Sequence, residues 1–131
     1  MTERTTNSAI AIVPCNDLDA AERWWGKLGF ARPRPEDPET FADYRILSDG
    51  QGAEVHLQAA VPGWVVPGRN PFGIYLSTPR VDELAALARE AIIEPGKTPA
   101  DKPWGMYEFA LAGPDGLLVR VGWPSRLRRK A

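Results

Sequence analysis

The stretch DYRILSDGQGAEVHLQA, residues 43–59, contains the clearest structural signal in this chain. Two strand candidates, at 43–48 and 53–59, flank the sequence DGQG at 49–52, and glycine-containing sequences of this kind favour tight hairpin turns. In the second run polar residues alternate with apolar ones, which is typical of a strand with one face in a core and the other toward water or a cavity. The polar residues of that run are Glu54, His56 and Gln58. The stretch therefore predicts a β-hairpin with one polar face.

Upstream of the hairpin, the sequence predicts a strand, a helix and a second strand. Residues 8–14 form a short apolar run typical of a strand. Asn16 or Asp17 can cap the helix that follows, and Gly29 ends it. The helix is indicated by apolar residues at helical spacing, namely Leu18, Ala21, Trp25 and Leu28. A further strand is expected around residues 30–34.

The same order of elements then recurs, so the chain reads as an internal repeat. The second copy comprises a strand at 72–77, a helix at 81–92, a Pro/Gly-rich stretch at 95–103, and two strands at 107–111 and 117–121 joined through 114–116. This pattern predicts one α+β domain built from two modules: module one at about 8–59 and module two at about 72–124. A linker at about 60–71 joins them, and a basic tail follows at 125–131. Each module leaves one sheet face uncovered, so we expect the two modules to pack together.

Length and composition favour a single soluble domain. The chain has 131 residues, of which 44% are hydrophobic and 25% charged, and this size is sufficient for a core without disulfides or metals. Its one cysteine, Cys15, excludes an intramolecular disulfide and is expected to be a buried, inert thiol, the alternative being a thiol activated at the helix start. No secretory signal and no apolar run of membrane-spanning length is evident. We therefore expect a cytoplasmic protein without a membrane partner.

The charges are distributed unevenly along the chain. The formal net charge is -1, but four basic residues, Arg126, Arg128, Arg129 and Lys130, lie among the last six. Setting these four aside leaves 12 basic against 17 acidic side chains. An acidic body repels phosphates, so nucleic acid is not an expected partner and the basic tail is interpreted as a solvated end.

Three stretches, in their order and spacing, resemble one known family. They are NDLDAA at 16–21 continuing to KLGF at 27–30, VDEL at 81–84, and KPWGMYEFAL at 102–111 continuing to PDG at 114–116. Together they resemble the vicinal-oxygen-chelate superfamily of glyoxalases, bleomycin-resistance proteins and extradiol dioxygenases, and the bleomycin-resistance type most closely. The resemblance covers residues 9–124. It implies paired βαβββ modules that form a cupped mixed sheet, and a homodimer with two grooves at the subunit interface.

Enzymes of this family are implied to hold a divalent metal between the modules, through the first and last strand of each. Carried over to this chain, the first-strand positions fall near Ala9 and Ile10, and near Gly73 and Ile74, and none of these side chains can bind a metal. The last-strand positions fall at His56 and Arg120. Histidine is a metal ligand, but a guanidinium is a fixed cation. We therefore expect no metal, no cofactor and no catalytic residue, with His56 either lining a cavity or hydrogen-bonded to a neighbour rather than acting as a catalytic base.

Aromatic and acidic side chains in loops indicate a ligand site. Trp64 lies in the linker and Trp104 in the loop before Tyr107, and loop aromatics often line binding grooves, although plain packing is the alternative. Glu36 and Asp37 belong to an acidic loop that either is simply solvated or contacts the ligand, as the resemblance implies. The full predicted ligand-binding set is Trp64, Trp104, His56, Arg120, Glu36, Asp37, Phe41 and Tyr107.

The sequence is thus interpreted as a homodimeric binding protein for a small aromatic, cationic molecule. The resemblance implies that it sequesters bleomycin-type glycopeptide antibiotics without breaking a bond, and a negatively charged body suits a cationic ligand. Two alternatives stay open from the sequence: a metal-dependent enzyme of the glyoxalase or dioxygenase kind, and a binding module for another metabolite.

Overall fold

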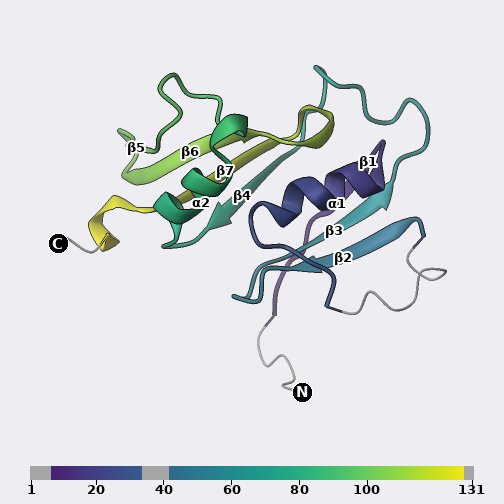
Figure 1. Cartoon of the computed structure of the whole chain (residues 1–131), viewed down its shortest axis with the longest axis horizontal. Coiled ribbons are helices and arrows are strands. Elements are labelled where there is room, and N and C mark those ends of the chain that lie inside the picture. The colour runs from purple at the N-terminus through teal and green to yellow at the C-terminus, as the bar shows by residue number, and fades with distance from the viewer. Residues whose placement is uncertain (1–6, 34–41, 129–131) are drawn as a thin grey trace.

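The computed structural model describes residues 7–33 and 42–128, which form two sheets with a helix against each (Figure 1). Module one contains β1 (Ile12–Cys15), α1 (Leu18–Gly26), β2 (Tyr44–Ser48) and β3 (Glu54–Ala59). Module two contains β4 (Gly73–Ser77), α2 (Val81–Leu87), β5 (Ala100–Asp101), β6 (Met106–Ala112) and β7 (Leu118–Pro124). Short 3-10 turns lie at Arg89–Ala91, Pro114–Gly116 and Ser125–Leu127. No helix in the described ranges is long and apolar enough to cross a membrane.

The two sheets share a core of three strands in the same arrangement, which agrees with the predicted repeat, and module two adds β5 at its edge. The strand order is β1-β3-β2 in module one and β4-β7-β6-β5 in module two. In each, the first strand runs parallel to the last, while the remaining pairs are antiparallel. Each sheet is therefore mixed, as expected for an α+β fold, but the described strands form two separate sheets rather than one cupped sheet.

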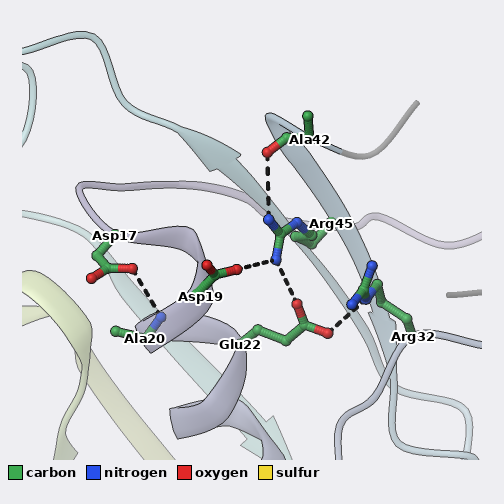
Figure 2. Close-up of polar contacts among 7 residues, drawn as sticks. All are labelled: Asp17, Asp19, Ala20, Glu22, Arg32, Ala42 and Arg45. Atoms are coloured by element: carbon green, nitrogen blue, oxygen red, sulfur yellow. Dashed lines mark hydrogen bonds and ion pairs between the residues drawn. The ribbon is translucent and has the colours of Figure 1, made fainter. Parts of the chain in front are cut away.

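Helix α1 follows closely from its sequence. The Asp17 carboxylate accepts a hydrogen bond from the Ala20 backbone N–H at 3.0 Å and so caps the first turn (Figure 2). Leu18, Ala21 and Trp25 are buried, as their spacing predicts. The chain reverses after the helix at Gly29, whose φ of +89° is a conformation that side chains rarely adopt. These residues position α1 against β2 and β3.

Two predicted elements differ from the structure. The helix expected at 81–92 ends at Leu87, because Ala88 leaves the helical region at φ −112° and ψ 23°, and a 3-10 turn replaces its last part. The strand expected around 30–34 is reduced to one bridge between Ala31 and Ser48, and residue 34 lies outside the described ranges. The Pro/Gly-rich stretch at 95–103 contains the short edge strand β5.

A polar cluster joins α1 to the helix-facing side of its sheet (Figure 2). Arg45 of β2 donates from Nη1 to Asp19 at 3.0 Å and to Glu22 at 2.7 Å. The second oxygen of Glu22 accepts from Arg32 Nε at 2.7 Å. Arg45 thus lies on the helix-facing side of β2, and the alternation of side chains along a strand places Tyr44 on the opposite face.

The modules share one apolar core and are joined by a polar contact. Buried residues of both modules, such as Leu57 and Phe109, belong to one cluster. At the edge of that core, Asn16 donates its backbone N–H and its side-chain amide to the Asp115 carboxylate, at 2.9 and 3.0 Å. Asp115 lies in the β6–β7 turn with φ +57°, and its carbonyl accepts from Asn70 at 3.2 Å. Burial, and then the nearby Asp115 charge, raises the pKa of the Cys15 thiol to about 12, which agrees with an inert cysteine.

Candidate functional site

Each sheet has one face that is turned away from its helix, and we call it the outer face. In β3, Val55 and Leu57 are buried in the core, so the alternating side chains of Glu54 and His56 belong to the outer face. In β7, Val119 and Val121 are buried, so Leu118, Arg120 and Gly122 belong to the outer face. These outer faces carry His56 and Arg120, the two strand residues among the polar groups predicted from the sequence.

The strand register shows that His56 and Arg120 occupy equivalent positions. His56 pairs with Ile12 of β1, and Arg120 pairs with Tyr75 of β4. Ile12 and Tyr75 each lie six residues before the first residue of the following helix. The first-strand positions expected near Ala9 and Ile10, and near Gly73 and Ile74, are therefore shifted to Ile12 and Tyr75.

These four positions do not fit a divalent metal. Isoleucine offers no ligand atom, and the guanidinium of Arg120 is a permanent cation with no lone pair to give. Arg120 is also paired with a carboxylate, Glu108, which would otherwise have been a candidate ligand. Within the described ranges, no three His, Cys, Asp or Glu side chains lie close enough to hold an ion.

The outer face of module one carries a chain of three polar side chains. The Tyr44 Oη lies 2.7 Å from His56 Nδ1, and His56 Nε2 lies 2.8 Å from a Glu54 oxygen. Both ring nitrogens therefore lie within hydrogen-bonding distance of a neighbour, and the donor in each contact depends on which nitrogen carries the proton. Both ring nitrogens are thus engaged, and His56 is held between two neighbours on its own sheet.

The outer face of module two is organised by a buried carboxylate. Glu108 of β6 is only 2% exposed, and it is the one charged residue that is buried in the described part of the chain. Its Oε1 accepts from Tyr75 Oη at 2.9 Å and from Trp104 Nε1 at 3.3 Å. Its Oε2 accepts from Arg120 Nη1 at 3.2 Å. A buried carboxylate is costly unless it is paired and hydrogen-bonded, and these three donors supply that compensation.

Gly122 makes this arrangement possible. It pairs with Glu108 across the β6–β7 ladder. A Cβ atom at position 122 would lie 2.0 Å from Tyr75 Oη and 2.8 Å from Glu108 Cβ. The missing side chain lets the Tyr75 phenol reach across β7 to the carboxylate. Burial, followed by the hydrogen bond to Glu108, raises the pKa of Tyr75 to about 12, although Arg120 acts in the opposite direction.

Three side chains held by Glu108 remain accessible from outside. Trp104 is 60% exposed, Tyr75 is 44% exposed, and the Arg120 side chain is 43% exposed. Beside Arg120 and Tyr75 lies a shallow depression of about 200 Å³, whose other walls are Gly73, Ile74 and Leu118. This face combines an aromatic surface, an apolar hollow and an accessible guanidinium.

The structure brings together only part of the predicted ligand-binding set. Trp104 and Arg120 meet at Glu108, and His56 holds the equivalent position in module one. Trp64 is exposed in the linker. Tyr107 lies on the helix-facing side, where its hydroxyl donates to Asp82 and the Arg128 guanidinium covers its ring at 3.4 Å, so it does not join the outer face. The predicted residues Glu36, Asp37 and Phe41 lie outside the described ranges.

Sequence reasoning missed the residue that organises this site. Glu108 is a charged residue inside an otherwise apolar strand, between Tyr107 and Phe109, and that position signals a buried carboxylate with a partner. Tyr75 gave a weaker signal, because it is one aromatic residue in a strand of alternating exposure. The register that places Tyr75 and Arg120 beside Glu108 is a property of the folded sheet.

Comparison with solved structures supports the same fold. The chain is similar to the bleomycin resistance determinant encoded on the transposon Tn5, with a TM-score of 0.72 and 25% identity over 91% of this chain and 98% of that chain. A bleomycin-binding protein complexed with bleomycin gives a TM-score of 0.70 at 24% identity, over 90% and 98% of the two chains. TioX from Micromonospora sp. ML1 gives 0.66 at 19% identity, over 91% and 99%. A comparison with curated proteins found no match.

The sequence itself matches a protein family over most of its length. Residues 8–121 match the Glyoxalase/Bleomycin resistance protein/Dioxygenase superfamily. The match begins before β1 and ends within β7, so it includes both modules and both outer faces. The chain belongs to the glyoxalase/bleomycin resistance protein/dioxygenase superfamily.

Proposed function

We propose that this protein binds a small aromatic, cationic molecule on its outer faces and sequesters it without chemical change. The observation that carries the proposal is Trp104, whose ring is 60% exposed while its Nε1 is fixed by the buried Glu108. An exposed aromatic ring that is already held in place loses little conformational freedom when a ligand stacks on it. The similarity to the Tn5 determinant and to the bleomycin-binding protein makes bleomycin-type antibiotics the first compounds to test.

Two physical terms would contribute to such binding. Stacking of a flat heteroaromatic ring on an indole contributes on the order of 1 kcal/mol beyond the burial of apolar area. The acidic body of the chain attracts a cationic group by a term that salt screens, because the Debye length falls from about 10 Å at 0.1 M to about 3 Å at 1 M. Binding is therefore expected to weaken with salt without disappearing.

We also propose a homodimer in which the ligand groove lies between subunits. Ile12 of β1 and Tyr75 of β4 are both exposed on the outer faces, next to the polar groups described above. Covering such faces with a second subunit buries apolar area and encloses a ligand on two sides. Gel filtration with light scattering measures this directly, and a monomer mass at micromolar concentration would exclude it.

The side chains on the outer faces favour the metal-dependent enzyme alternative less than they favour binding. A metal-dependent reaction needs ligand atoms at equivalent positions of the two modules, and one of these positions holds Arg120 in an ion pair with Glu108. His56 has one carboxylate beside it, that of Glu54, but among the described residues no third His, Cys, Asp or Glu side chain lies close enough to complete a metal site with them. Sequestration requires only the stacking surface and the charge.

The test is a calorimetric titration with bleomycin at low and high salt, supported by quenching of tryptophan fluorescence. We expect saturable binding whose dissociation constant rises with salt. Trp104→Ala should weaken binding by about tenfold at every salt concentration, since stacking is not screened, and Trp64→Ala should weaken it as well. Trp24→Phe is the control, because Trp24 packs against the core at α1. The absence of saturable binding at high micromolar bleomycin would reject the antibiotic as ligand.

A further inference from the structure

The charge that a ligand can reach on the outer face of module two is positive. Glu108 is buried, and both of its oxygens are occupied by donors from Tyr75, Trp104 and Arg120. A ligand cation therefore has no open path to this carboxylate. The Arg120 side chain, in contrast, is 43% exposed. The ion pair is neutral as a whole, but its positive end is the one that faces outward.

Most of the Arg120 hydrogen-bonding capacity is still available. A guanidinium has five N–H donors in a planar fork, and within the described residues Arg120 uses Nη1 for Glu108. That bond also fixes the orientation of the side chain. The remaining donors match the geometry of a carboxylate, which accepts two parallel hydrogen bonds from a guanidinium.

An apolar hollow lies directly beside this guanidinium. The depression of about 200 Å³ is walled by Gly73, Ile74 and Leu118, with Tyr75 and Arg120 completing its lining. Its apolar walls favour a hydrocarbon or aromatic group, and its one charged wall favours an anion. An aromatic carboxylate satisfies both requirements at once.

We propose that the outer face of module two is a subsite for a carboxylate carried by an aromatic ligand, with Arg120 as the binding residue and Glu108 as the positioning residue. The inference rests on the proposed binding function and narrows its ligand class. A molecule that fills the whole groove would carry a carboxylate at this end in addition to its cationic group. The Arg120 donors bind the carboxylate, and the ring lies in the hollow beside Tyr75.

The test compares two probes of equal size and opposite charge, 2-naphthoate and 2-naphthylmethylammonium, by calorimetric titration at low salt. We expect the wild-type protein to bind the naphthoate at least tenfold more tightly. Arg120→Met should reduce naphthoate affinity at least tenfold, and Arg120→Lys should reduce it severalfold, because lysine retains the charge without the planar fork. Arg80→Met is the matched control, since Arg80 is half-buried like Arg120 and is paired with Glu83 at the start of α2.

A second variant distinguishes loss of the binding residue from loss of folding. Arg120→Met leaves Glu108 buried without its cation, so the double variant Arg120→Met with Glu108→Gln removes both charges together. It should also lose naphthoate binding while the circular dichroism spectrum is retained. Gly73→Ala is expected to fold, because its added Cβ meets Leu118 O at an ordinary 3.6 Å, and it should weaken both probes by filling the hollow.

The outcomes separate this inference from the proposed function. Equal naphthoate affinity in the wild type and in Arg120→Met would overturn the subsite, and so would tighter binding of the cationic probe. Naphthoate binding that depends on Arg120 in a protein that does not bind bleomycin supports the subsite and rejects the antibiotic. Bleomycin binding without any naphthoate binding at millimolar concentration supports the proposed function and rejects the subsite.

Discussion

In module one the outer face places His56 between Tyr44 and Glu54, whereas the equivalent position of module two holds Arg120 beside Glu108. The two positions share strand topology and register, but their carboxylate partners lie on different strands, Glu54 on β3 itself and Glu108 on the neighbouring β6. The Glu54 side chain is 20% exposed and keeps some contact with water. Glu108 is buried, and its charge must be balanced inside the protein.

The comparison shows how burial of a carboxylate determines its partner. A partly solvated carboxylate is adequately satisfied by a hydrogen bond to an imidazole and by contact with water. A buried carboxylate needs a permanent countercharge and several donors, because desolvation of an isolated charge is too costly. Module two meets this need with Arg120, Tyr75 and Trp104, and these same side chains then form an accessible surface.

The largest effect on stability is expected from adding one methyl group to the outer face of module two, at Gly122. In Gly122→Ala the new Cβ would lie 2.0 Å from Tyr75 Oη and 2.8 Å from Glu108 Cβ, and the latter atom cannot move without the strand. We expect the free energy of unfolding to fall by about 1 to 3 kcal/mol, as for other overpacked sites. Urea denaturation followed by circular dichroism measures this loss.

A substitution to alanine at the equivalent position of module one, Gln58, serves as the comparison. Gln58 lies two residues after His56, just as Gly122 lies two residues after Arg120. It is half-buried, and Gln58→Ala should change the free energy of unfolding by about 0.5 kcal/mol or less. If the two variants lost the same stability, Gly122 would have no special role beneath Tyr75.

A smaller difference in the free energy of unfolding is expected when the hydroxyl groups of two tyrosines are removed in turn. Tyr75→Phe removes a hydrogen bond to a buried carboxylate, and we expect a loss of about 1 to 2 kcal/mol in the free energy of unfolding. Tyr44→Phe removes a hydrogen bond to a histidine ring, and we expect about 0.5 to 1 kcal/mol. Paired urea titrations at pH 7 compare them, and a larger loss for Tyr44→Phe would reverse our ranking of the two faces.

The smallest effect is a pH dependence that belongs to module two. The pKa of Tyr75 is raised from 10.0 to about 12, first by burial and then by its bond to Glu108, so the folded state favours the neutral phenol. The stabilising contribution is complete below pH 10 and is lost as the pH rises toward 12. In a pH titration, the absorbance of the ionised phenol should therefore appear only near pH 12 for Tyr75. The same holds for Tyr107, whose pKa is raised to about 12 by burial and by Asp82.

That titration is assigned by substitution. Tyr75→Phe should remove part of the absorbance change near pH 12, in a chain that has three tyrosines. The remaining late change should belong to Tyr107 and should be removed by Tyr107→Phe. A Tyr75 phenol that ionises near pH 10 in the folded protein would show that Glu108 does not hold it.

Local sequence patterns predicted the elements because they depend on near neighbours. The apolar spacing of α1, its Asp17 cap and the turn at 49–52 all act within a few residues, and all are present in the structure. The shortened α2 was missed because its end depends on Ala88 and the following bridge of Ile92 to Leu111. That bridge joins residues far apart in the chain.

The candidate site was predicted less completely, because it too depends on contacts between residues far apart in the chain. Trp104 and Arg120 were recognised by residue type, but their common partner Glu108 depends on the pairing of β6 with β7 and of β7 with β4. Tyr107 shows the reverse case, because an aromatic residue next to Glu108 faces the helix instead. A one-residue step along a strand decides which face a side chain joins.

The contact between Asn16 and Asp115 sets an order of events in folding. These residues are 99 positions apart, and closing a loop of that length costs about 4 kcal/mol in chain entropy. Hydrogen bonds that contribute about 1 kcal/mol each cannot offset this cost in an open chain. We therefore expect the contact to close after the two sheets have formed, and on the ribosome it must wait until the β6–β7 turn has been synthesised. The residues at the start of α1 are synthesised long before this turn, and they gain the Asp115 contact only afterwards.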